Sequence, residues 1–365
     1  MSETRVSIRR GELAQRLERA ALDGAVLDNR DDIFYFTGYT GSDAMAILPA
    51  RGERFWLATD SRYQEEAELT APGADIRIRT GGLGKAVGKL LRKLRLRRVG
   101  FTPNSLQVFQ FDAMRLEAPE VSRWLNVGQE ISAMRAVKDA NEIQAVEKAL
   151  AIAEAAFLAS RKRWRIGMSE IEVKNDLEWE MRRLGADDAA FETIAAAGAN
   201  ASLPHAHSGQ GKIRPGKMLL VDFGARLARY HSDLTRTLWA GEIPKVWRRR
   251  YQAVQAAQRA GALAIQPGVS CRVPDQAANR VLAAVGLDEY FSHGLGHGVG
   301  LAIHEAPTLS RRSRQILAPG NVVTVEPGIY LPGVGGIRLE DMALVTPRGS
   351  RLISSLPREI DDLIF

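Results

Sequence analysis

The sequence predicts an α+β protein with a small α/β domain at residues 1–127 and a larger domain at residues 128–365. Three observations support this division. Short apolar segments alternate with helical patterns before residue 127, which is typical of an α/β domain. Long amphipathic helical patterns follow, and one motif there occurs twice, which indicates an internal repeat. With 365 residues, 45% of them hydrophobic, the chain can bury a core in both domains.

The first domain is expected to combine short strands with helices. Apolar runs between turn-forming residues predict strands at 24–28, 45–49, 54–58 and 99–102, and helices are expected at about 11–22, 61–69 and 84–98. The last helical segment alternates basic residues with leucines. We interpret it as an amphipathic helix with a solvated basic face rather than a phosphate-binding patch. No aromatic residues interleave these charges, so no nucleic-acid partner is expected, despite a net charge of +7.

The second domain shows start and stop signals for long helices. Asp139 with Glu142, and Ser169 with Glu172, each match the capping-box pattern that opens a helix. Glycine or a Pro-Gly pair then marks where helices stop. The expected helices begin near 139 and run over about 169–185, 245–266 and 274–286.

Cysteine content and hydropathy limit the cellular setting. The single cysteine, Cys271, excludes an internal disulfide and fits a reducing compartment. No run of 18 apolar residues occurs, and the N-terminus lacks the apolar segment of a signal peptide. We therefore expect a cytoplasmic protein with no membrane partner.

The repeated motif places an acid at the same point twice. Residues 214–224 and 318–328 each contain a Pro-Gly turn, an apolar run, an acid and, two residues later, a glycine. The acids are Asp222 and Glu326. Burying an unpaired carboxylate is costly, so two such acids on duplicated halves suggest a cation between them. The repeat predicts two similar halves related by a pseudo-twofold axis.

Each repeated acid has a second acid beyond a turn. If the first turn centres on residues 227–228, Asp222 and Asp233 become direct cross-strand neighbours with Cβ atoms about 5 Å apart. A hairpin through the glycine-rich segment that follows Glu326 sets it opposite Glu340 in the same way. Like charges at such positions repel unless a dication lies between them. The two pairs could therefore hold two dications.

Histidines complete the candidate site. His297 lies in the glycine-rich run 292–300, where the backbone can approach a ligand closely, and it is the best candidate for a nitrogen ligand. His293 and His304 are candidates for hydrogen-bond donors or proton carriers. With His205, four of the six histidines accompany the acidic motifs, which favours a site over isolated polar residues.

Other catalytic motifs are incomplete. Neither 81–84 nor 294–296 continues into a dinucleotide-binding fingerprint, and the sequence contains no P-loop. His304-Glu305 lacks the second histidine of a zinc-protease helix. Ser208 has no nucleophile-elbow frame.

The ordered motifs resemble those of the pita-bread metallopeptidases, and most closely their Xaa-Pro branch, which contains aminopeptidase P and prolidase. The resemblance covers nearly the whole chain and rests on residues 33–38, 59–63, 196–205, 221–224, 232–237, 293–301, 303–305, 325–330 and 337–341. It implies a creatinase-like N-terminal domain followed by a pita-bread (creatinase/aminopeptidase) catalytic domain.

The resemblance implies a dinuclear metal centre. Its protein ligands would be Asp222, Asp233, His297, Glu326 and Glu340, with Asp233 and Glu340 bridging the two ions. The oxygen-rich ligand set suits Mn²⁺, although Co²⁺ or Zn²⁺ could substitute. Glu326 would also accept the proton of the bridging water.

The resemblance also assigns residues around the substrate. His205 and His304 would contact the substrate or stabilise the tetrahedral intermediate. His293 and Arg338 match neighbouring catalytic support positions, and Arg338 and Tyr330 are also assigned to substrate binding.

The implied function is that of a Xaa-Pro aminopeptidase, which hydrolyses the bond between an N-terminal residue and a following proline with a metal-bridging water or hydroxide. A Xaa-Pro dipeptidase (prolidase) is the alternative. Several prolidases carry an arginine where this chain has Thr308, although Arg311, Arg312 and Arg314 follow closely as alternative cations. Creatinase lacks metal ligands that are retained here, and a non-catalytic binding module is a more distant alternative. The resemblance further suggests a homodimer.

Overall fold

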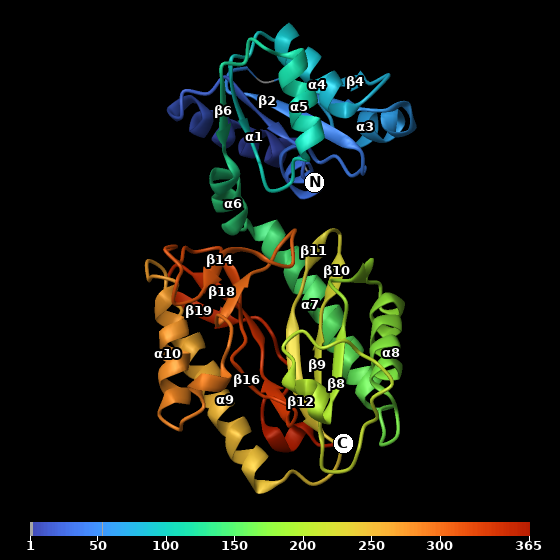
Figure 1. Ribbon diagram of the computed structural model, residues 1–365, viewed down its shortest axis with the longest axis vertical. Helices are drawn as coiled ribbons and strands as arrows, with labels where there is room; N and C mark the ends of the chain where they lie inside the picture. The colour runs from blue at the N-terminus through green and yellow to red at the C-terminus, as the bar shows by residue number, and fades with distance from the viewer. Residues whose placement is uncertain (1–2, 53) are drawn as a thin grey trace. The chain divides into compact units, whose positions relative to one another are not determined.

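The computed structural model describes residues 3–52 and 54–365. Two compact units follow each other along the chain, the first ending at Arg135 and the second beginning at Ala136. Each unit has its own sheets and helices (Figure 1). No helix in the described residues is long and apolar enough to cross a membrane.

The first unit is built on one six-stranded sheet in the order β4-β3-β2-β1-β5-β6. Its strands are β1 (Gly24–Leu27), β2 (Ala44–Pro49), β3 (Phe55–Thr59), β4 (Ala74–Ile78), β5 (Arg98–Phe101) and β6 (Arg123–Asn126). Its helices are α1 (Glu3–Arg19), α2 (Arg30–Thr37), α3 (Gln64–Thr70), α4 (Leu83–Lys93), α5 (Val108–Glu117) and α6 (Gly128–Ala136). The four strands and three helices expected from the sequence are confirmed, with shifts at their ends.

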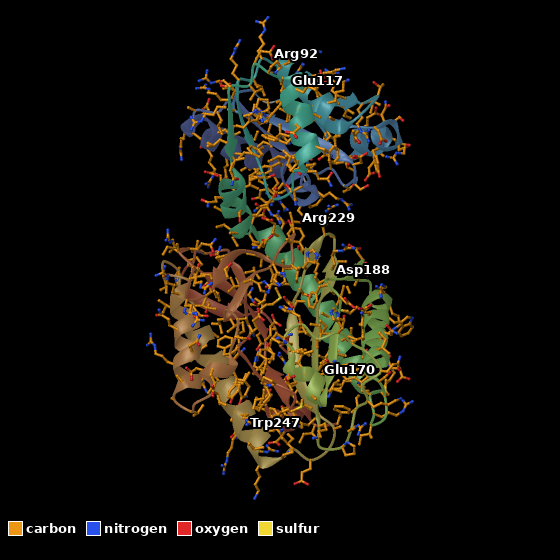
Figure 2. The ribbon with its side chains drawn as sticks, viewed as in Figure 1. Arg92, Glu117, Glu170, Asp188, Arg229 and Trp247 are labelled. Carbon is orange, nitrogen blue, oxygen red and sulfur yellow. The ribbon has the colours of Figure 1, made fainter. Side chains whose placement is uncertain are left out.

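Helix α4 is amphipathic, as expected. Val87 and Leu91 are buried, whereas Lys89 and Arg92 are exposed. Arg92 lies near the outer end of this helix (Figure 2). The helix ends at Lys93, earlier than expected, and Arg95 adopts a left-handed conformation with φ of 56° before β5 begins.

The second unit places helices outside a group of sheets (Figure 1). Helices α7 (Ala140–Arg161) and α8 (Glu170–Arg183) pack together, as do α9 (Lys245–Leu263) and α10 (Arg272–Ala283). Both expected capping boxes are confirmed, at Asp139 for α7 and at Ser169 for α8. The two helix pairs lie on opposite sides of the strands, in keeping with two similar halves.

The strands between the helix pairs form several small sheets. One contains β8 (Ile194–Ala197), β9 (Met218–Phe223) and β12 (Leu234–Trp239), and another contains β7 (Asp188–Ala189), β10 (Ala225–Leu227) and β11 (Tyr230–His231). The five-stranded sheet contains β13 (Gly296–Gly298), β14 (Glu305–Leu309), β15 (Val322–Val325), β18 (Asp341–Thr346) and β19 (Gly349–Leu352). The last sheet pairs β16 (Gly328–Leu331) with β17 (Gly335–Arg338).

One hydrophobic core joins three of these sheets. Leu220 of β9, Val325 of β15 and Ile337 of β17 belong to the same buried cluster as Val254 of α9. Because close-packed cores resist deformation, the strand ends are held in fixed relative positions. The repeated acids lie at those ends.

The strand registers test the expected pairing of acids. The second pairing is confirmed, because Val325 pairs with Asp341 and Gly328 with Arg338, and the same register sets Glu326 opposite Glu340. The first expectation is wrong, because Asp222 pairs with Thr235 and not with Asp233.

The error in the first hairpin comes from its turn. Leu227 pairs with Tyr230, so the turn lies at Ala228 and Arg229, which have φ values of 48° and 72°. Left-handed backbone at two non-glycine residues is uncommon and leaves little trace in a sequence. A shift of two residues keeps the same side chains on the same face, so Asp233 still lies diagonally across from Asp222.

Candidate metal centre

Strand ends position the five predicted metal-binding side chains. Asp222 lies near the end of β9, and Asp233 directly precedes β12. Glu326 directly follows β15, and Glu340 directly precedes β18. His297 is the central residue of β13. At these positions the strands hold the backbone rigidly, and the side chains extend out of the apolar core.

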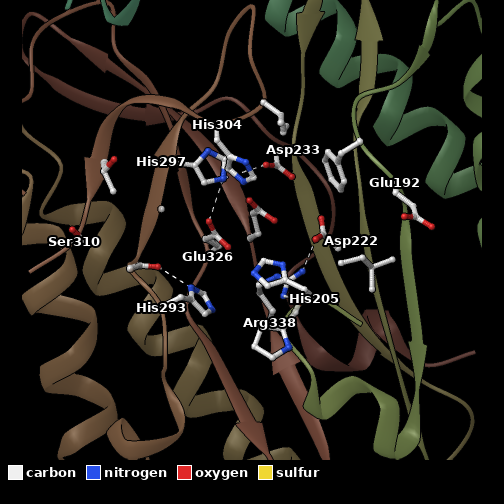
Figure 3. Close-up of a pocket in the computed structure, with 18 residues that line it drawn as sticks. Glu192, His205, Asp222, Asp233, His293, His297, His304, Ser310, Glu326 and Arg338 are labelled. Carbon is white, nitrogen blue, oxygen red and sulfur yellow. Dashed lines mark hydrogen bonds and ion pairs between the residues drawn. The ribbon is translucent and has the colours of Figure 1, made fainter. Parts of the chain in front are cut away.

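A cavity of about 480 Å³ brings together nine of the ten predicted site residues (Figure 3). They are His205, Asp222, Asp233, His293, His297, His304, Glu326, Arg338 and Glu340. The tenth, Tyr330, bonds to two of these residues from behind the cavity wall. Part of the remaining lining is apolar, namely Phe191, Ile194, Pro204 and Ile303, and the first two of these lie outside every sequence motif of the site.

The hydrogen bonding of His297 leaves one ring nitrogen available for a metal. Its Nδ1 lies 3.1 Å from the carbonyl oxygen of Gly298, an acceptor, so Nδ1 carries the proton in the neutral ring. Its Nε2 lies 3.5 Å from Asp233 Oδ2 and 3.4 Å from Glu326 Oε1. Ligand atoms of Asp233, His297 and Glu340 all lie within 4.8 Å of one another. These three side chains could therefore bind one cation.

Two carboxylate oxygens in the cluster lack partners. Asp222 Oδ2 accepts a hydrogen bond from Arg338 Nη2 at 2.5 Å, and Glu340 Oε2 accepts one from Thr235 Oγ1 at 2.6 Å. The other oxygens, Asp222 Oδ1 and Glu340 Oε1, are buried with no hydrogen-bond partner among the described residues. Buried polar atoms are normally satisfied, so the unpartnered oxygens fit coordination to a divalent cation.

The electrostatics of the four acids favour a cation. Burial, followed by the charges of neighbouring carboxylates, raises the pKa of Asp233 and of Glu340 well above the ordinary carboxyl range. Burial also raises the pKa of Asp222, although Arg338 opposes the shift. For Glu326, burial raises the pKa, whereas His293 and Arg338 lower it. Burial and mutual repulsion therefore disfavour the ionised carboxylates, and a bound cation would offset both effects.

A hydrogen-bonded chain supports one side of the cluster. His293 Nδ1 lies 2.8 Å from the Gly294 carbonyl oxygen and so carries the proton, which leaves Nε2 to accept from the Tyr330 hydroxyl at 2.9 Å. Burial raises the pKa of Tyr330 to about 12, so this hydroxyl stays protonated. It also accepts from Arg338 Nη1 at 2.9 Å. The guanidinium that holds Asp222 is thus itself held in place.

Two histidines face the acids from different loops. His304 lies beside His297, with ring centroids 4.2 Å apart, and His205 lines the cavity on the side of Arg338 (Figure 3). Partial desolvation, together with the nearby His297, lowers the pKa of His304. Its imidazole is therefore neutral at neutral pH, when it can donate one hydrogen bond to a ligand.

Two threonines in the site were not predicted. Thr235 donates to Glu340 and accepts from Arg338 Nε at 2.9 Å. Thr324 bonds to Glu326 Oε1 at 3.2 Å and accepts from the backbone N–H of His297 at 3.0 Å. Each lies two residues along the chain from one of the acids. Because side chains two residues apart in extended backbone point to the same face, this spacing could have identified both threonines.

Two protein-family models match the chain. Residues 144–347 match metallopeptidase family M24, and residues 9–137 match the creatinase/prolidase N-terminal domain. The uncharacterized peptidase YqhT of Bacillus subtilis is 36% identical over 339 residues, which cover 93% of this chain and 95% of YqhT.

Solved structures agree with this match. The Xaa-Pro dipeptidase from Bacillus anthracis has a TM-score of 0.93 and 34% identity, covering 98% of this chain and 100% of that one. The X-Pro aminopeptidase from Thermotoga maritima has a TM-score of 0.86 and 32% identity, covering 96% and 99%. The predicted fold class is therefore confirmed. The chain belongs to metallopeptidase family M24, in its Xaa-Pro branch, with a creatinase/prolidase N-terminal domain and a pita-bread catalytic domain.

Proposed function

We propose that the protein is a metal-dependent peptidase that cleaves the bond between an N-terminal residue and a following proline. The main support is the cluster of largely buried carboxylates around the unprotonated Nε2 of His297, with unpartnered oxygens on Asp222 and Glu340. Together with Asp233 and Glu326, these residues would hold two divalent ions. Asp233 and Glu340 would be shared between the ions.

The proposed metal is Mn²⁺, because four carboxylates and one imidazole make an oxygen-rich ligand set; Co²⁺ and Zn²⁺ remain alternatives. Two such ions, when bound, polarise the scissile carbonyl and lower the pKa of the attacking water. Glu326 is proposed to accept the proton that this water loses. Its carboxylate is oriented for that role by the Thr324 hydroxyl.

Two of the remaining site residues would act on the substrate, and the others would support the cluster. His205 and His304 line the cavity from two sides and are proposed to donate hydrogen bonds to the carbonyl oxygen as it gains charge. His293 and Tyr330 hold Arg338, which fixes Asp222.

Substrate length distinguishes two forms of this activity. We propose an aminopeptidase, because the cavity offers little to bind the free carboxylate of a dipeptide. Arg338 is the one arginine or lysine among the described lining residues, and it is paired with Asp222. Thr308 lines the cavity, whereas Arg311 and Arg312 line a neighbouring one. The name of the Bacillus anthracis relative instead favours a dipeptidase.

The Mn²⁺-loaded protein should be tested with Ala-Pro and with Arg-Pro-Pro. Release of arginine from Arg-Pro-Pro is the result expected of an aminopeptidase. Hydrolysis confined to Ala-Pro would refute that form and support the dipeptidase. Hydrolysis of neither peptide by protein that has bound metal would contradict both.

A further inference from the structure

A buried lysine lies next to the loop that carries His304. Lys138 is in the short connection between α6 and α7, and its Nζ lies 2.6 Å from Glu305 Oε1. The two side chains are only 1% and 8% exposed. Lysine is rarely this buried, and the desolvation of such a pair offsets much of its attraction. The pair is therefore poorly explained by stability alone.

The partner, Glu305, organises the loop from Gly300 to Glu305. Its second oxygen, Oε2, accepts a hydrogen bond from the backbone N–H of Ala302 at 3.3 Å. A Cβ at Gly300 would collide with the Glu305 carboxylate and lie 3.0 Å from Lys138 Cε. The loop backbone thus packs directly on the ion pair, and a side chain at residue 300 would displace the Glu305 carboxylate.

The same loop reaches both sides of the cavity. Ile303 and His304, the two residues before Glu305, line the cavity. The carbonyl oxygen of Gly300 accepts a hydrogen bond from the backbone N–H of His231 at 2.9 Å, two residues before Asp233. Displacement of the Glu305 carboxylate would therefore move the His304 imidazole relative to the acids.

We propose that Lys138 is a positioning residue that acts through Glu305 to hold the His304 imidazole over the carboxylate cluster during turnover. The inference rests on the proposed peptidase function. Lys138 is not among the described residues that line the cavity, and its ion pair is with Glu305, which is not a proposed metal ligand, so its removal should leave metal binding intact.

The first test is Lys138→Met, with Lys148→Met as the matched control. Lys148 is exposed on α7, so its replacement removes the same charge without opening the loop. Lys138→Met should lower kcat about tenfold or more with KM and metal content little changed, as for other outer partners of site residues. Lys138→Arg should restore much of the loss. Wild-type kcat in Lys138→Met would overturn the proposal.

A double-mutant cycle separates positioning from general destabilisation. If Lys138 acts through His304, Lys138→Met should have no further effect on kcat/KM in a His304→Ala background. Additive losses in the double variant would contradict the proposal. Should Lys138→Met fail to fold, Lys138→Met/Glu305→Gln removes both charges and permits the same comparison.

A measurement that does not use activity distinguishes this inference from the proposed function. Hydrogen exchange of the amides at 300–305 should be faster in Lys138→Met than in the wild type or Lys148→Met. Unchanged exchange would overturn the anchoring role, even if the enzyme is active. Faster exchange in a protein that cleaves no Xaa-Pro peptide would instead sustain the anchor and refute the peptidase proposal.

Discussion

The two repeated halves of the second unit place an acid at the same point but surround it differently. Asp222, in the first half, is held by Arg338, which comes from the second half. Glu326, in the second half, is contacted by Thr324 and His297 of its own half. The duplicated strands therefore set the positions of the acids, whereas the differences between the halves determine which acid is paired with an arginine and which with a histidine.

The second acid of each half has a pKa that is shifted further. Asp233 and Glu340 have pKa values raised well above the ordinary range, because burial and neighbouring carboxylates act in the same direction. For Asp222 and Glu326 the nearest charges are mainly basic: Arg338 and His297 oppose the rise in the pKa of Asp222, and His293 and Arg338 oppose that of Glu326. The contrast indicates that Asp233 and Glu340 depend most on a bound cation.

The largest expected effect is that of Asp233→Ala. Loss of a shared ligand should remove several kcal/mol of transition-state stabilisation, which corresponds to a decrease on the order of 10³-fold or more in kcat. Circular dichroism should show an intact fold, and metal analysis should show fewer bound ions. Full turnover in this variant would refute the metal assignment.

The next prediction concerns His205→Ala and His304→Ala. Each should raise the barrier by roughly 3 kcal/mol, because a hydrogen-bond donor to the developing oxyanion is lost. Metal content should be unchanged, since neither side chain is a proposed ligand. A variant that loses metal instead of kcat would show that its histidine belongs to the ligand set.

The pH dependence of stability tests the contrast between the acids. A carboxyl whose folded pKa is raised stabilises the fold at low pH, and that contribution is lost as pH rises through the raised pKa. These carboxyls should therefore lower the melting temperature of metal-free protein as pH rises above about 4, by about 2–4 °C for each kcal/mol lost, against the opposite contribution of the site histidines, whose pKa values are lowered. Saturating Mn²⁺ should remove this trend. Asp233→Asn should weaken it without metal, whereas an unchanged slope would contradict the role of this acid.

The smallest effects are expected for the threonines. Thr235→Val removes the hydroxyl that donates to Glu340 and accepts from Arg338, so metal affinity should fall about tenfold. Thr324→Val affects Glu326 and the backbone of His297, and its effect should be smaller. Titration with Mn²⁺ would measure both affinities. An equal or reversed order would contradict the expected difference between the two threonines.

The residues of the site could be identified from the sequence more fully than their positions relative to one another. Acids that end apolar strands are conspicuous, so Asp222 and Glu326 could be identified from the repeat. The glycine-rich turn after Tyr330 revealed the second hairpin and hence the facing pair Glu326 and Glu340. The first hairpin turns through left-handed Ala228, which carries no comparable signal, so its register was wrong.

Elements of the first unit were missed for related reasons. Strand β6 is short and mostly half-exposed, so it lacks an apolar run. Helix α2 spans only eight residues and depends on the Asn29 side chain, which accepts from two backbone N–H groups at its start. The Lys138–Glu305 pair joins residues far apart in the chain, and only the fold shows that they meet.

The central claim is that Asp233 and Glu340 are shared between two divalent ions. Metal-free wild type and Glu340→Gln should be titrated with Mn²⁺, with the bound metal counted per chain and the electron paramagnetic resonance spectrum recorded. We expect two ions per wild-type chain with a spin-coupled spectrum, and loss of the coupling in Glu340→Gln. A single uncoupled ion in the wild type, or a coupled pair that survives Glu340→Gln, would contradict that claim.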